Sequence, residues 1–108
     1  MAKIIDSERP FIEEAQQSMH PSFEYVAFVV CIPESDEFLV QEERVSKGVE
    51  RLLFGRGVPG KAKRFVRMKK AMKVAEEKAE RRVAMLFEND NQFQIKVIQE
   101  VGEPAVQD

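Results

Sequence analysis

The stretch from Phe23 to Ile32 is apolar on both alternating faces and rich in β-branched and aromatic residues. Such a run predicts a strand in the middle of a sheet, covered on both sides, because a half-exposed strand would alternate apolar and polar residues. Residues 33–36 read Pro-Glu-Ser-Asp, which is turn chemistry, since proline presets its own φ. A second apolar run begins at Phe38, so residues 23–42 are predicted to form a β-hairpin.

Apolar residues spaced by three and four positions predict two short helices around this hairpin. The first helix ends before His20 and Pro21, because proline holds the preceding residue in extended geometry. Its apolar stripe consists of Phe11, Ile12, Ala15 and Met19. The second helix is predicted from the spacing of Val45, Val49, Leu52 and Leu53, with Gly55 closing it. Residues 2–6 are predicted to form a short strand.

A third, longer helix is predicted between residues 61 and 88, after a loop that contains Gly57, Pro59 and Gly60. Its apolar stripe follows the same steps and consists of Phe65, Met68, Met72, Ala75, Ala79, Val83 and Leu86. Residues 82–88 also fit a second interpretation, a strand that pairs with the following segment across a turn at residues 89–91. The unbroken stripe favours the helix.

Residues 93–97 alternate apolar and polar positions, which predicts a half-buried strand with Gln94 and Lys96 facing water. The whole order is (β)αββααβ, and the predicted fold class is α+β: a small three- or four-stranded, mainly antiparallel sheet with helices packed on one face. If the first strand forms, the order resembles a ferredoxin-like split βαβ arrangement with an extra helix. Residues 1–101 are predicted to be one domain, followed by a flexible polar tail at 102–108.

The composition of the 108 residues fits a folded domain, with 44% hydrophobic residues and eight Phe. The longest apolar run, residues 26–32, is far below the roughly 18 residues needed to cross a bilayer, so no membrane contact is expected. The first ten residues lack an apolar signal core, and one cysteine permits no internal disulfide. These features predict a cytoplasmic protein.

The net charge of −2 conceals a strong segregation. Residues 47–82 hold 13 of the 17 Lys and Arg residues but only four of the 19 acids, a local charge of +9. Eight bases and no acid lie between residues 56 and 73. On one exposed helix face, such a run would follow a phosphate backbone. We therefore expect binding of RNA or DNA through Arg56, Lys61, Lys63, Arg64, Arg67, Lys70 and Lys73, without strong sequence preference.

The same segregation supports an alternative of a different class. A protein-interaction module or small inhibitor could dock its basic region on an acidic partner, or two copies could pair basic with acidic regions as a homodimer. The Met and Ala residues of the long stripe would permit close packing against another helix, although packing on the domain's own sheet is the favoured interpretation.

The loop at residues 55–61 formally matches G-x-x-x-x-G-K. A nucleotide-binding P-loop also needs a preceding strand and a Ser or Thr after the lysine, whereas this chain has Ala62. A milder version remains, in which Arg56, Lys61 and the free N–H groups of a following helix hold one phosphate of a ligand.

Signatures of catalysis are scarce. His20 is the only histidine, and Cys31 lies on the predicted central strand, where a core role is expected. A weaker hypothesis is a metal-dependent nuclease that uses Gln94 and Lys96 together with an acid such as Glu24 or Glu37. No family motif is matched. The sequence thus predicts a non-enzymatic binding protein without cofactor or metal.

Overall fold

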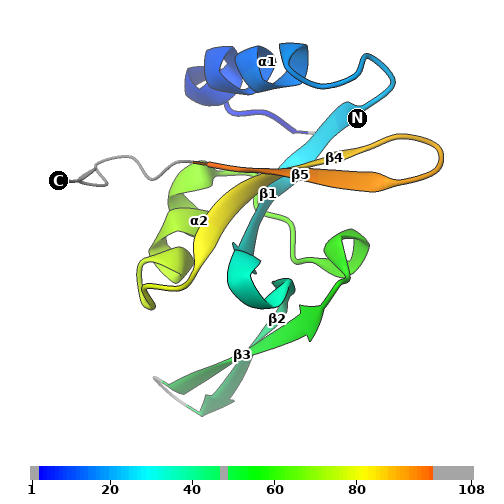
Figure 1. Cartoon of the computed structure of the whole chain (residues 1–108). Coiled ribbons are helices and arrows are strands. Elements are labelled where there is room, and N and C mark those ends of the chain that lie inside the picture. Colours follow the sequence, from blue (N-terminus) through cyan, green and yellow to red (C-terminus); the bar gives the residue numbers. More distant parts are fainter. Residues whose placement is uncertain (1–2, 47–48, 99–108) are drawn as a thin grey trace, which may run out of the picture.

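The computed structural model describes residues 3–46 and 49–98 (Figure 1). The predicted tail at 102–108 lies outside the described residues. The strands are β1 (Glu24–Ile32), β2 (Glu37–Ser46), β3 (Val49–Arg56), β4 (Arg82–Glu88) and β5 (Phe93–Val97). The helices are α1 (Arg9–Gln17) and α2 (Met68–Ala75), with single 3-10 turns at η1 (Asp6–Glu8), η2 (Pro33–Ser35) and η3 (Pro59–Lys61).

The predicted fold class is wrong in the size of the sheet and in the arrangement of the helices. Five strands form one curled sheet in the order β3-β2-β1-β4-β5, and every described strand pair is antiparallel. The two helices are short and lie apart, so they form no continuous layer: α1 lies beyond the β4–β5 hairpin, whereas α2 lies beside β1 and β4 (Figure 1), although both contribute residues to the larger core cluster. Residues 3–5 form no strand, which also removes the ferredoxin-like arrangement.

The prediction of a buried central strand at residues 23–32 is confirmed by β1. Its residues from Ala27 to Cys31 are all buried, because β1 is flanked by β2 and β4 and covered on both faces. One face carries the larger cluster, in which Phe28, Val30, Met85 and Phe87 pack with residues of both helices. The other face carries a smaller cluster around Val29, Cys31, Leu86 and Phe38.

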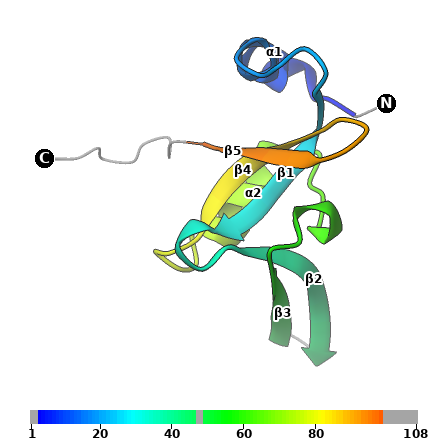
Figure 2. The same ribbon diagram turned by 45° about the vertical axis from the view of Figure 1, so that its right-hand side comes forward.

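The helix predicted at 45–53 is wrong, since the described residues of this range, 45–46 and 49–53, belong to the strands of the β2–β3 hairpin. Figure 2 shows this hairpin projecting away from the rest of the sheet. The long helix at 61–88 is also wrong: only Met68–Ala75 is helical, and Arg82–Glu88 forms β4. The second interpretation of residues 82–88 is therefore correct, because β4 turns at Asn89 and pairs with β5.

The predicted hairpin of β1 and β2 is confirmed, but its two strands soon separate. They pair only at Cys31 with Phe38 and at Ile32 with Glu37. Beyond that point, the extended segment 62–66 lies between them. Phe65 exchanges two backbone hydrogen bonds with Phe28 (2.9 and 3.0 Å), and the N–H of Lys63 donates to the carbonyl of Leu39 (2.7 Å). This insertion splays β2 from β1 and explains why the sheet curls.

Within residues 3–46 and 49–98, no helix combines the length and the apolar character that a membrane crossing requires.

Candidate nucleic-acid interface

The seven cations predicted to bind nucleic acid fall on a strand, a 3-10 turn, the connecting segment and α2, and not on one helix face. Arg56 ends β3, and Lys61 ends η3. Lys63 and Arg64 lie on the extended segment 62–66, Arg67 lies between that segment and α2, and Lys70 and Lys73 lie on α2. Figure 1 shows η3 and α2 on different sides of the molecule, joined by this segment. The cations therefore form a track across the molecule and not a single compact patch.

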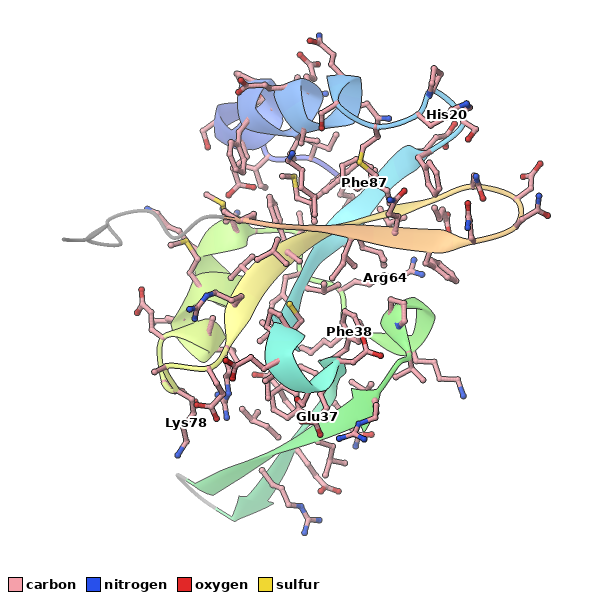
Figure 3. The ribbon with its side chains drawn as sticks, viewed as in Figure 1. His20, Glu37, Phe38, Arg64, Lys78 and Phe87 are labelled. Carbon is pink, nitrogen blue, oxygen red and sulfur yellow. The ribbon has the colours of Figure 1, made fainter. Side chains whose placement is uncertain are left out.

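The extended segment owes its orientation to two buried side chains. Ala62 and Phe65 are 5% and 7% exposed and belong to the two hydrophobic clusters. With Phe65 fixed by its backbone pairing to β1, Arg64 and Arg67 are left exposed to solvent. Figure 3 shows Arg64 on the side of the molecule that carries η3. The sheet thus holds residues 62–67, here called the cationic strap, in a defined extended conformation.

Lys63 differs from its neighbours in the strap, because a nearby carboxylate already neutralises part of its charge. Its Nζ lies 3.6 Å from a carboxylate oxygen of Glu42 and 5.6 Å from the centre of the Phe65 ring. Arg56 lies directly opposite one acid, Glu37, in the β2–β3 register. Arg64, Arg67, Lys70 and Lys73 form no ion pair with any carboxylate in the described part of the chain.

The helix α2 completes the track. Ala71, Val74 and Ala75 are buried against the larger cluster, which leaves the lysines on the opposite side of the helix. A shallow hollow of about 570 Å³ lies along this side, with Met68 and Met72 among its lining residues. Its rim includes Lys69, Lys70 and Lys73. Lys69 was not among the predicted residues, although its place in the acid-free run could have identified it.

The phosphate-binding version of the 55–61 loop is wrong on two grounds. After Lys61 the chain continues in an extended conformation (Ala62 ψ 144°), so no helix opens at the loop. The nearest helix N-terminus, that of α2, is already occupied: the backbone N–H of Met68 donates to Oε2 of Glu8 (3.0 Å). A carboxylate there satisfies the positive end of the helix dipole that a phosphate would need.

The nuclease hypothesis also fails on geometry. Glu24, Glu88 and Phe93 lie directly opposite one another across β1, β4 and β5, which places Glu24 on the Phe93 face of the sheet. Gln94 and Lys96 lie on the other face, since side chains alternate along a strand. Glu37 belongs to β2, on the far side of β1 from β5. Among the described residues, no three His, Cys, Asp or Glu side chains come close enough to hold a metal.

Cys31 is a core residue, as predicted. It is 1% exposed, and its burial raises the pKa of the thiol to about 11, although the guanidinium of Arg82 lowers that pKa in part. A thiol with this pKa is almost entirely protonated at neutral pH and is a poor nucleophile.

Comparisons of the chain with protein-family models, with curated proteins and with solved structures found no match.

Proposed function

We propose that this protein binds the phosphate backbone of RNA or DNA, without catalysis of its own, through the cationic track of residues 56–73. The observation that carries the proposal is the run of exposed charges at Arg64, Arg67, Lys70 and Lys73, for which residues 3–46 and 49–98 provide no carboxylate partner. Burial of Ala62 and Phe65 fixes the strap that carries Arg64 and Arg67, and burial of Ala71, Val74 and Ala75 fixes the helix that carries Lys70 and Lys73. The backbone under these charges therefore needs little further ordering when they bind a polyanion.

The chemistry of the track supports backbone contact rather than base reading. Phe65, the only aromatic residue within 56–73, is buried and not available for stacking on a base. Contacts from Lys and Arg to phosphates carry no sequence information. The proposal is therefore for binding that tolerates many sequences and that weakens steeply with salt, as counterions return to the phosphates. We also propose a cytoplasmic location, which the free thiol of Cys31 supports.

The proposal is tested by fluorescence anisotropy with labelled single-stranded and duplex oligonucleotides over a series of salt concentrations. The test variant is Arg64→Glu with Arg67→Glu. The matched control is Lys3→Glu with Lys78→Glu, which changes the net charge equally at exposed sites outside the track.

The test variant should lose about tenfold or more in affinity, and its salt dependence should fall by about two phosphate contacts. The control should keep most of the affinity. No binding at tens of micromolar in low salt, or an equal loss in the control, contradicts the proposal.

A further inference from the structure

The strand β5 ends the sheet with a regular edge that pairs with no other strand in the described part of the chain. The N–H of Ile98 donates to the carbonyl of Val83 (2.8 Å), and antiparallel alternation from this pair directs the backbone groups of Lys96 and Gln94 toward β4. The N–H and C=O groups of Phe93, Ile95 and Val97 therefore point away from the sheet. Among the described residues no strand pairs with this side of β5.

Exposed apolar side chains gather at the same edge. Five large apolar side chains stand out as exposed in the described part of the chain, and three of them lie here: Phe93 and Val97 at 42% and Phe11 at 38%. Phe11 and Val97 line a cavity of about 460 Å³ between α1 and the end of β5. Natural sheets use proline, bulges or charges to keep a free edge from pairing with another chain. In β5 only Lys96 offers such protection.

We infer that β5 pairs antiparallel with β5 of a second copy of this chain, with Ile95 opposite Ile95, to make one continuous sheet across a two-fold axis. In this register Phe93, Ile95 and Val97 each donate their outward N–H and accept at their outward C=O, so the edge is fully used. Phe93 of each copy meets Val97 of the other on one face, and aromatic residues paired with β-branched ones stabilise sheets.

The charges of β5 select this register. With Ile95 at the centre, Lys96 of each copy lies opposite Gln94 of the other, and no like charges meet. A shift of two residues in one direction would place Lys96 opposite Lys96, which is unfavourable. A shift in the other direction leaves Val97, already 42% exposed, without a cross-strand partner. The strand is thus complementary to itself in hydrogen bonding, shape and charge. The inference is independent of nucleic-acid binding.

The test uses sedimentation equilibrium of the full chain between about 5 and 500 μM, since a two-strand interface is small and its affinity modest. Gln94 is exposed, so two opposite changes at this position probe the register without disturbing the core. Gln94→Glu would face Lys96 twice across the axis and should lower the dimer Kd about threefold to tenfold at low salt. Gln94→Lys should raise the Kd by a similar factor.

The matched controls are Gln41→Glu and Gln41→Lys, which make the same charge changes at an exposed position on β2. A monomer at all concentrations overturns the inference. So does a shift of the Kd in the same direction for both Gln94 variants, or a response of the Gln41 variants equal to theirs. A lower Kd for Gln94→Glu that is lost at high salt supports it.

Discussion

Glu8 and Met68 are 60 positions apart in the chain, yet the carboxylate of Glu8 accepts the first free backbone N–H of α2 at 3.0 Å. Glu8, the residue just before α1, thereby caps the N-terminus of α2. Arg67, which precedes α2, provides no side-chain cap of its own. The second carboxylate oxygen of Glu8 is buried and has no hydrogen-bond partner among the described residues.

The first prediction concerns this contact. Glu8→Ala leaves the N-terminus of α2 uncapped and should lower the free energy of unfolding by about 1 kcal/mol. Glu8→Gln keeps an acceptor oxygen but removes the charge at the helix dipole, so it should cost roughly half as much. Urea unfolding measures both. Glu13→Ala, an exposed change on α1, is the control, and an equal loss there would remove the special role of Glu8.

The second prediction concerns the neighbouring phenol. The hydroxyl of Tyr25 is buried without a hydrogen-bond partner in the described part of the chain, while its ring packs edge-on against Phe28 and Phe87. Tyr25→Phe keeps the ring and removes the unpaired hydroxyl. It should raise the free energy of unfolding by about 1 kcal/mol. Thermal unfolding of the two proteins checks the sign, and a clear loss of stability would mean that the hydroxyl has a partner in solution.

The third prediction is a loss of stability in alkali. Burial raises the pKa of the Cys31 thiol from 9.0 to about 11, and burial together with the charge of Glu8 raises the pKa of Tyr25. Between pH 9 and 11 the unfolded chain releases these protons while the folded chain keeps them. The free energy of unfolding must then fall with rising pH, for Cys31 by about 2 kcal/mol at most.

Urea unfolding at pH 7, 9, 10 and 11 measures this slope. Cys31→Ala lowers stability at every pH because it leaves a cavity, but it should make the decline above pH 9 shallower. An unchanged slope in that variant would show that Cys31 does not contribute.

The fourth prediction ranks the residues of the cationic strap. Lys63→Gln should weaken oligonucleotide binding less than Arg64→Gln does, because Glu42 already neutralises part of the Lys63 charge at 3.6 Å. Its effect on stability should stay below about 1 kcal/mol, since both partners are partly exposed and solvent screens the pair. Anisotropy titrations of the two variants at one salt concentration decide the ranking.

The sequence allowed β1 to be predicted because a strand buried on both faces is a continuous β-branched and aromatic run. The prediction of a helix at residues 82–88 was wrong for the same reason. An unbroken apolar run fits a helical stripe and a doubly buried strand equally well, and only pairing with β1 separates the two. Residues 76–80 favour helix by propensity, but the chain must reverse there to bring Arg82 beside Cys31.

The candidate interface was predictable in its residues but not in its shape. The acid-free run between 56 and 73 identified Arg64, Arg67 and Lys70, which remain exposed. No local pattern showed that Phe65 would pair with Phe28, 37 positions earlier, and so turn a predicted helix into an extended strap. The partial neutralisation of Lys63 by Glu42 is likewise a tertiary contact.

The pairing of β1 with β4 delays the burial of β1 while the protein is being synthesised on the ribosome. The ladder pairs Glu24 with Glu88 at one end and Cys31 with Arg82 at the other. The partner of β1, the most apolar strand of the chain, is therefore synthesised more than fifty residues after β1 itself. Until then Val29 and Val30, fully buried in the finished fold, have only the short contact with β2 and the strap to cover them. A nascent chain stalled before Arg82 should therefore expose this strand to chaperones, and one released beyond Glu88 should not.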